Sequence, residues 1–399
     1  MGSPVRVLFS FPHKIGADRI CSIAWYQVAG VTDAGGDVLA CPGAVHRPLP
    51  AKVRVSPTLG RGRFGIPYRA IGRQRAFALH DTIVARRLPR LAKELDVVHA
   101  WPVGARRTLE AAARLGIPTV LERPNAHTRF AYEVVRDEAD RLGVALPANH
   151  EHAYNDEVLR IEEEEYRLAD YLLCPSDFVV KTFLDQGFPP EKLLRHSYGF
   201  DDRVFRPADS PEEGTSGLTM LFVGVAAVRK GLHFALEAWL RSPASRDGTF
   251  LIAGEVLPAY GERLAPMLAH PSVQVLGHRT DVPDLMRRSD VLVLPSIEEG
   301  FGLVCVEAMG SGCVPLVSDA CTDACRHMET ALVHHVGDVD ALESHITAVH
   351  EDRDLLVTLR AGAIAAAPRY TWTAVGVELA NVYRDAASPA PAAAATSPS

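Results

Sequence analysis

The clearest structural signal in the chain lies in residues 291–315, which read Val291-Leu-Val-Leu-Pro-Ser-Ile-Glu-Glu-Gly-Phe-Gly-Leu-Val-Cys-Val-Glu-Ala-Met-Gly-Ser-Gly-Cys-Val-Pro315. An apolar run of strand length ends at Pro295, a glycine-containing loop follows, and a helix is predicted to begin near Leu303. The first N–H groups of a helix have no partner within it, and the helix dipole favours negative charge there. The pattern therefore predicts a strand, a loop and a helix N-terminus suited to a phosphate.

The loop and the helix also carry two acidic residues. Glu299 lies in the loop and Glu307 about one turn inside the helix, so both can point into one cleft. Each carboxylate accepts several hydrogen bonds, and such charge-assisted bonds suit neighbouring sugar hydroxyls. Gly300 and Gly302 lack a Cβ and let a ligand approach the main chain. The alternative interpretation is a surface loop with two solvated glutamates.

Outward from this stretch, the first half of the chain alternates short apolar runs with longer amphipathic segments. This rhythm predicts a mainly parallel sheet covered by helices on both faces. The expected strands are Val5–Phe11, Asp37–Cys41, Val53–Ser56, Val97–Trp101, Thr119–Arg123, Tyr171–Pro175 and Leu193–Tyr198. The expected helices include Ile20–Val31, Ala70–Leu95, Arg106–Leu115 and Asp177–Gln186.

A second α/β domain is expected over residues 218–370, after a linker at 201–217 that is rich in acidic residues and proline. Its expected strands are Thr219–Val223, Phe250–Ala253, Val273–Leu276, Val291–Pro295 and Val314–Val317. Residues 371–385 should form a helix, capped by Thr371, that packs back onto the first domain or onto the second. Residues 386–399, rich in Ala, Pro and Ser, are expected to be disordered.

The predicted fold class is α/β, with two Rossmann-like domains, residues 1–200 and 218–370, whose parallel sheets face a central cleft. Ligands of such sheets bind at the carboxyl ends of the strands.

The strand-Pro-Ser pattern with Glu299, Glu307 and the following Ala-Met-Gly-Ser-Gly-Cys-Val-Pro resembles the signature of the retaining GT-B glycosyltransferases of family 4, the group 1 glycosyltransferases. The resemblance extends over roughly residues 90–385. It includes the stretches at 169–178, 198–201, 221–231 and 275–279.

The resemblance implies transfer of a sugar from a nucleoside diphosphate sugar, UDP-sugar first and GDP-sugar second, to a hydroxyl or amine of a small-molecule, glycan or lipid acceptor. It assigns Glu299 to the donor sugar, Glu307 to the ribose, and Arg229 with Lys230 to the diphosphate. It implies that the departing phosphate takes the acceptor's proton and that no metal or cofactor is needed. The remaining donor-binding candidates are Gly224, Gly277, His278, Arg279, Gly300, Phe301, Gly302 and Leu303.

The same scaffold also suits two other functions, because fold and phosphate site do not determine the reaction. These alternatives are an isomerase or phosphorylase acting on an activated sugar, and a nucleotide-sugar-binding protein without turnover.

Candidates from the first half rest on the same resemblance. Many relatives place a histidine close to the end of the strand equivalent to Thr119–Arg123, where it meets the donor sugar, so His127 is the catalytic candidate and Glu122 the alternative occupant of that site. The acceptor-side candidates are Lys14 and Gly16 in the first loop, together with Glu122. One departure concerns Val225, where many relatives carry an arginine that Arg229 is expected to replace.

The amino-acid composition and net charge of the chain exclude several classes of protein and of binding partner. The 399 residues are 47% hydrophobic and 23% charged with a net charge of −7, which excludes collagen-like, disordered and membrane-spanning classes and argues against a nucleic-acid partner. The odd count of seven cysteines predicts free thiols in a cytoplasmic protein, and no secretory signal or paired-cysteine metal spacing is seen.

A basic stretch at 61–93 contains nine basic residues and one acidic residue. It is either a solvated helix face or a surface for an anionic acceptor or for peripheral contact with acidic lipid. The G-x-G-x-x-G pattern at 60–65 lacks the strand context of a dinucleotide site.

Overall fold

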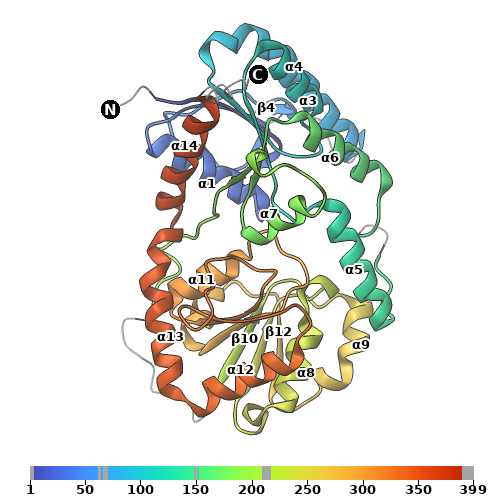
Figure 1. The fold of residues 1–399 in the computed structure, drawn as a ribbon, viewed down its shortest axis with the longest axis vertical. Coiled ribbons are helices and arrows are strands. Elements are labelled where there is room, and N and C mark those ends of the chain that lie inside the picture. Colours follow the sequence, from blue (N-terminus) through green and yellow to red (C-terminus); the bar gives the residue numbers. More distant parts are fainter. Residues whose placement is uncertain are drawn as a thin grey trace, which may run out of the picture.

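The computed structural model describes residues 4–61, 64–65, 71–147, 150, 152–208 and 217–388. Two parallel sheets organise the chain, one above the other in Figure 1. The first has the order β3-β2-β1-β6-β7-β8-β9. Its strands are β1 (Arg6–Ile15), β2 (Asp37–Val45), β3 (Arg54–Val55), β6 (Val97–Ala100), β7 (Thr119–Glu122), β8 (Tyr171–Cys174) and β9 (Leu193–Arg195).

The second sheet has the order β12-β11-β10-β13-β14-β15, again with parallel neighbours. Its strands are β10 (Thr219–Val223), β11 (Thr249–Ala253), β12 (Val273–Gly277), β13 (Val291–Leu294), β14 (Val314–Ser318) and β15 (Leu332–His334). The predicted pair of parallel sheets is confirmed. The short edge strand β15 was not among the expected strands, because three residues carry too little periodicity to be recognised.

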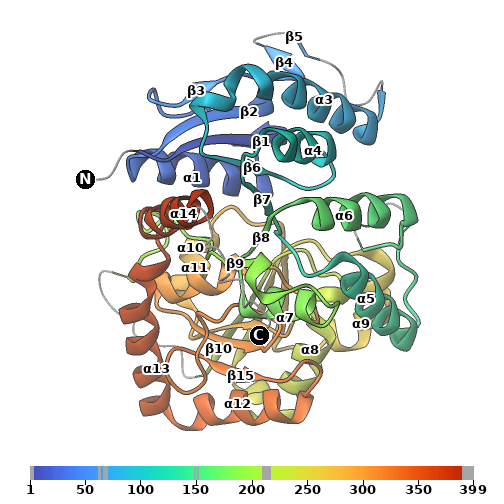
Figure 2. The ribbon, with the colours of Figure 1, turned by 45° about the horizontal axis from the view of Figure 1, so that its top comes forward.

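Helices cover the faces of both sheets (Figure 2). In the first half they are α1 (Ile20–Asp33), α3 (Arg73–Leu91), α4 (Arg106–Leu115), α5 (Thr128–Leu142), α6 (Asp156–Leu168) and α7 (Asp177–Leu184). In the second half they are α8 (Leu232–Arg241), α9 (Pro258–Leu268), α10 (Val282–Arg288), α11 (Leu303–Ser311), α12 (Val339–Glu351), α13 (Arg353–Ala366) and α14 (Trp372–Ala387). No described helix combines the length and apolarity needed to cross a bilayer.

The last helix crosses from the second half to the first, along the left side of Figure 1. Thr371 caps α14 through Oγ1, which accepts from the N–H of Ala374, as expected. The helix packs on α1 through two facing glycines: a Cβ on Gly376 would lie 2.6 Å from the Cα of Gly30. The disordered tail was expected from residue 386, but Ala386 is buried in α14 because it continues the packed face of the helix. Residues 389–399 lie outside the described part.

The two places where the chain passes between the halves lie side by side. The N–H of Phe200 donates to the carbonyl of Tyr370 at 2.9 Å, and the N–H of Trp372 donates back to Phe200 at 3.2 Å. Residues 209–216 of the expected 201–217 linker lie outside the described residues.

Helix α5 follows a strand of the first sheet yet packs on the second half (Figure 1). Glu138 Oε1 lies 2.8 Å from His233 Nε2, and Arg263 donates to the carbonyl of Leu142 at 3.2 Å. Ala139 and Val144 join the hydrophobic core of the second half. These contacts hold the two halves together on the side opposite α14.

Candidate functional site

The loop after β13 has the predicted geometry. The buried strand ends at Leu294, and α11 begins at Leu303 with Gly302 as its N-terminal boundary residue. Gly302 has φ 71°, a left-handed conformation that favours glycine. Glu299 is buried within the loop. The loop therefore presents a buried carboxylate beside a helix N-terminus.

The two predicted cations reach this loop from β10. Arg229 and Lys230 lie in a short helical turn that ends at Gly231. A Cβ on Gly231 would lie 2.0 Å from the carbonyl oxygen of Pro295, so only a glycine lets the two loops touch. The N–H of Ile297 donates to the carbonyl of Arg229 at 2.8 Å and ties the loops together. Residues about 70 positions apart thus form one site.

Charges in this site are arranged in a compact group. Lys230 Nζ bonds Glu299 Oε1, Arg229 Nη1 lies 3.5 Å from the same oxygen, and Ser296 Oγ donates to it at 2.9 Å. Burial alone would raise the pKa of Glu299, but the positive charges of Lys230 and Arg229 outweigh it and hold that pKa below its ordinary value. Glu299 is therefore an anion at neutral pH, and the two cations are held in place by it.

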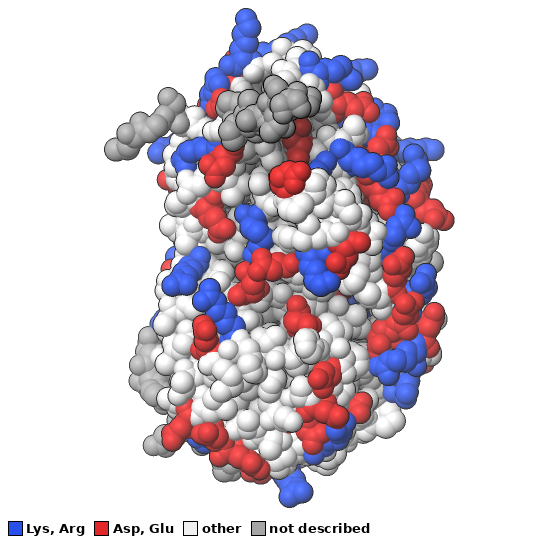
Figure 3. All heavy atoms as spheres, in the orientation of Figure 1, with Lys and Arg blue, Asp and Glu red and all other residues white. Residues whose placement is uncertain are grey.

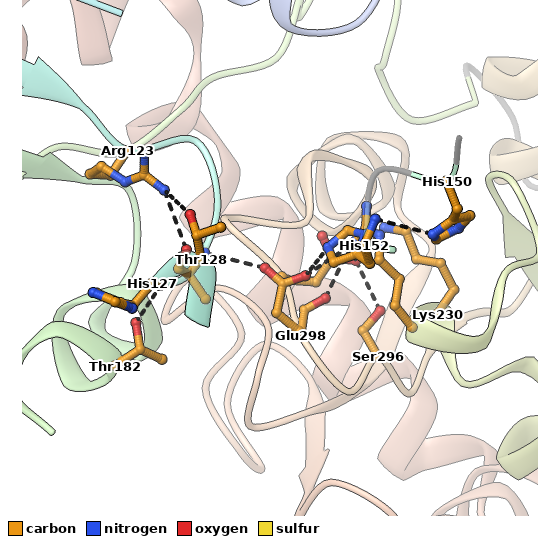
Figure 4. Close-up of polar contacts among 12 residues, drawn as sticks. Arg123, His127, Thr128, His150, His152, Thr182, Lys230, Ser296 and Glu298 are labelled. Atoms are coloured by element: carbon orange, nitrogen blue, oxygen red, sulfur yellow. Dashed lines mark hydrogen bonds and ion pairs between the residues drawn. The ribbon is translucent and has the colours of Figure 1, made fainter. Parts of the chain in front are cut away.

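A second buried carboxylate, Glu298, joins the halves and was not predicted (Figure 4). His152 Nε2 lies 3.1 Å from Glu298 Oε2, and the N–H of Ala126 donates to Oε1 at 3.2 Å. Arg229 Nη1 also donates to the carbonyl of Glu298 at 3.0 Å. Burial would raise the pKa of Glu298, but His152, Arg229 and the Ala126 amide lower it to about 2. No local signal marks this role, because all three partners come from distant segments.

A cavity of about 690 Å³ opens between the halves at this point, a size typical of small-molecule and cofactor sites. Arg229, Lys230 and residues 299–304 line it from the second half. The first half contributes, among others, Arg19, Asn125 and Tyr198. The structure thus brings Glu299, Gly300, Phe301, Gly302 and Leu303 together with both predicted cations in one cleft.

The loop is also pressed against the first half. A Cβ on Gly300 would lie 1.7 Å from the carbonyl oxygen of Pro124, and Ser176 Oγ donates to the Gly300 carbonyl at 2.7 Å. Phe301 packs edge-to-face on Tyr198 with ring centroids 5.7 Å apart. The absence of a side chain at Gly300 is therefore what lets the two halves meet here.

The other donor-side candidates lie around the cavity or beyond it. Gly224 has φ 133° and precedes Val225, which lines the cavity. Glu307 lies one turn after Leu303 in α11, and burial raises its pKa to about 7. Gly277, His278 and Arg279 do not line it; both side chains are exposed, and Arg279 pairs with Asp281 at 2.6 Å. The predicted base region is therefore separate from the cavity in this arrangement.

The ring of His127 does not line the cavity, and its catalytic role stays a prediction. It packs against the rings of Tyr166, Phe183 and Phe188 at centroid distances of 5.2, 5.0 and 5.9 Å. In Figure 4 it lies beside Thr182, away from Lys230. His127 immediately precedes α5, and its ring packs among these aromatic side chains.

The three acceptor-side candidates lie outside this cavity as well. Strand β1 continues to Ile15, so Lys14 is an exposed strand residue and not part of a loop. Gly16 has φ 82° and forms the turn itself, close to Arg47. Glu122 is fully buried and accepts from Gln27 at 2.7 Å and Tyr198 at 2.8 Å. None of the three lines the cavity; Arg19 and Asn125 do.

A buried ring with a low pKa makes His127 useful for a test of stability. Burial, followed by the charges of Arg123 and Arg129, lowers its pKa to about 3. Because the unfolded chain takes up the proton near pH 6.5, the contribution of neutral His127 is present above that pH and is lost as the pH falls toward 3. His127→Gln should therefore lose about 1 kcal/mol less unfolding free energy than wild type between pH 7 and pH 5.5.

Urea titrations at the two pH values measure this difference, with the exposed His46→Gln as the control. Turnover of His127→Gln should stay close to that of wild type. A large loss of turnover with an unchanged unfolding free energy would support the catalytic interpretation of His127.

All seven cysteines are free thiols, and six of them are buried. Across the residues that the structure describes, no group of three or more His, Cys, Asp or Glu side chains is placed to hold a metal ion. The metal-independent reaction stays a prediction.

Comparison with known proteins shows that this chain is similar to glycosyltransferases. Residues 217–352 match the protein family described as glycosyl transferases, group 1. The chain is 27% identical to a D-inositol 3-phosphate glycosyltransferase of Thermobispora bispora, over 56% of this chain and 58% of that protein. It is 29% identical to a GDP-mannose:cellobiosyl-diphosphopolyprenol alpha-mannosyltransferase of Xanthomonas oryzae pv. oryzae, over 43% and 48%. The matches span about half the length of these relatives.

Solved structures extend the likeness to the whole fold. HepE of Anabaena in complex with UDP superposes with a TM-score of 0.64 at 18% identity, covering 96% of this chain and 100% of that one. Sucrose-phosphate synthase of Thermosynechococcus elongatus gives 0.68 at 17% identity, covering 96% and 98%. The protein therefore has a GT-B-type fold. Its second half matches the group 1 glycosyltransferase family over residues 217–352, which confirms the resemblance seen in the sequence.

Proposed function

We propose that this protein is a retaining glycosyltransferase that moves a sugar from a nucleoside diphosphate sugar to a hydroxyl or amine of an acceptor. The observation that carries the proposal is the meeting of Arg229, Lys230 and Glu299 at the wall of a cleft between two Rossmann-like halves. Two fixed cations beside a helix N-terminus suit a diphosphate, and a buried carboxylate suits sugar hydroxyls.

Donor binding would redistribute the charges of this group. The diphosphate takes Lys230 and Arg229 as partners, and Glu299 then accepts hydrogen bonds from the donor sugar. Glu307, on the next turn of α11, is assigned to the ribose. The main chain at 300–303 lies beside the same space and contacts phosphate or sugar.

In the proposed reaction the bond between the anomeric carbon and the phosphate oxygen breaks. A bond from the acceptor oxygen or nitrogen forms on the same face of the sugar. The departing phosphate oxygen takes the acceptor's proton, so no protein base is required. Negative charge grows on the diphosphate in the transition state, and cations already held in position lower that barrier more than they tighten ground-state binding.

UDP is the favoured nucleotide. The support is that structures of HepE, which shares this fold, are complexes with UDP and with UDP-glucose. A GDP-sugar is the second choice, since one relative is described as using GDP-mannose.

Contact of the stretch 61–93 with acidic lipid stays a prediction, as does the cytoplasmic location. Residues 62–63 and 66–70 of that stretch lie outside the described residues, and over the face in Figure 3 acidic and basic side chains alternate.

The proposal is tested by incubating the protein with UDP-, GDP- and ADP-sugars in the presence of EDTA. We expect slow release of free sugar with retained anomeric configuration, fastest from a UDP-sugar. UDP at about 100 times its Kd should also raise the free energy of unfolding by ~2.7 kcal/mol.

The other possible functions give different products in the same assay. An epimerised donor identifies an isomerase, and a sugar 1-phosphate formed with inorganic phosphate identifies a phosphorylase. Nucleotide binding without any product identifies a binding protein. Any of these outcomes contradicts the proposed transfer.

A further inference from the structure

A second cavity, of about 180 Å³, lies beside the first and wholly within the first half of the chain. It is bounded by the end of β1, the start of α3, the segment after β6 and the loop from β7 into α5. Ile20, Pro124 and Asn125 line both cavities, so the two meet at the exposed Asn125. A molecule in the second cavity would therefore face the donor site at this residue.

The wall of the second cavity is largely aromatic with a few polar groups. Phe77, Trp101 and Tyr132 provide flat apolar surface of the kind that packs on sugar rings and other small cyclic molecules. Trp101 is buried, and its indole Nε1 has no hydrogen-bond partner in the described part of the chain. A buried N–H without a partner is costly, which favours a ligand that accepts from it.

His13 is the polar group at the end of β1. Its ring packs edge-to-face on Phe77 with centroids 4.6 Å apart. Burial, followed by the charge of Arg73, lowers the pKa of His13 to about 4. The ring is therefore neutral at physiological pH, and it offers one donor and one acceptor to a ligand hydroxyl.

The charges on the wall do not cancel. Arg123 is neutralised by Glu162 at 3.1 Å. Arg73 is exposed and, within the described residues, has no carboxylate partner. The sequence contains no Asp or Glu between Asp37 and Asp81, so none of the neighbouring residues along the chain supplies one. One positive charge is left over at this cavity.

Arg73 itself lines the cavity, and its guanidinium carbon lies 5.9 Å from the ring centroid of Phe77. The positive charge of Arg73 lowers the pKa of His13. Burial raises the pKa of Tyr132 to about 12, and the charge of Arg73 partly offsets that rise. These two rings come from β1 and α5, on different walls. Arg73 is also the first residue of α3, a helix of 19 residues whose boundary residue Gly72 provides no side-chain cap. The unsatisfied N–H groups of that first turn add to the attraction for an anion.

We propose, on the basis of the function proposed above, that the second cavity binds the acceptor and that this acceptor is a small hydroxylated molecule carrying an anionic group held by Arg73. The body of the acceptor packs among Phe77, Trp101 and Tyr132. Its attacking hydroxyl lies at Asn125, where the two cavities meet. Arg73 is thus the residue that selects the acceptor.

The test uses matched pairs of neutral and anionic probes with the protein saturated by UDP, so that the donor site is occupied. The pairs are glucose with glucose 6-phosphate, glucose with glucuronate, and glycerol with glycerol 3-phosphate. Calorimetry should show that at least one anionic member binds at least 10-fold more tightly than its neutral partner. Arg73→Ala should remove that preference, whereas Arg75→Ala, an exposed arginine of the same helix that does not line the cavity, should keep it.

The outcomes distinguish failure of the proposed glycosyltransferase function from failure of the proposed acceptor site. If UDP itself does not bind, the proposed function fails. If UDP binds but no anionic probe exceeds its neutral partner, or if Arg73→Ala retains the preference, only the acceptor proposal is overturned. Thermal unfolding midpoints of the two arginine variants should match wild type, because both side chains are exposed.

Discussion

Replacing Lys230 with alanine is expected to lower turnover by about 100- to 1,000-fold, the usual cost of removing one preorganised group that stabilises developing charge. Lys230 bonds Glu299 in the unliganded site and is the nearer of the two cations to that carboxylate. In the proposed reaction it also neutralises the departing diphosphate. Turnover measured by nucleoside diphosphate release, together with UDP affinity, separates loss of catalysis from loss of binding.

The variant also leaves Glu299 buried with less compensation, which lowers stability as well. The double variant Lys230→Ala/Glu299→Gln removes this stranded charge, so it should recover the thermal midpoint while staying inactive. Lys181→Ala is the matched control, since Lys181 is exposed and pairs with Asp185, the residue that follows α7, at 2.6 Å. Near-normal turnover in Lys230→Ala with an intact fold would refute the site.

The second large effect is expected from Gly300→Ala. The new methyl group would occupy the space of the Pro124 carbonyl oxygen, which belongs to the other half of the molecule. Because protein interiors are close-packed, either the loop must shift or the halves must separate. Either change also breaks the hydrogen bond from Ser176 to Gly300 and widens the cleft that carries the proposed chemistry. We expect turnover to fall at least 100-fold and the thermal midpoint to fall by several degrees.

Small-angle scattering should show a larger radius of gyration for Gly300→Ala if the halves separate. The control is Gly261→Ala within α9, where the nearest atom to the added methyl group is a Val256 side-chain carbon at 3.1 Å, no backbone oxygen is displaced, and alanine favours the helix. Wild-type turnover in Gly300→Ala would show that close contact between the halves is not needed.

Two loops of the candidate site could be predicted from the sequence alone. The loop at 295–303 and the turn at 224–231 were recognised because each combines a buried strand, glycines and a charged residue within about ten positions. Such local patterns constrain the backbone directly, through the left-handed glycines Gly231 and Gly302 and the helix that each precedes. The strands themselves follow from continuous apolar runs, since a parallel sheet is buried on both faces.

The sequence did not reveal the features that long-range packing decides. His127 is one residue from Ala126, whose N–H contacts Glu298, yet its ring turns toward Phe183 and Tyr166. His152 reaches Glu298 from a segment without a recognisable pattern. Helix α5 follows a strand of the first sheet but contributes to the core of the second half.

From the sequence alone came the two parallel sheets, the glycine loop with Glu299, and the cations Arg229 and Lys230 in the turn after β10, because neighbouring residues and their periodicity dictate local backbone and burial. Tertiary structure alone decided which side chains share the cleft, that Glu298 and His152 join its halves, and that Arg73 lines a second cavity without a carboxylate partner among the described residues. These features depend on contacts between residues tens to hundreds of positions apart, and packing determines such contacts only once the whole chain is folded.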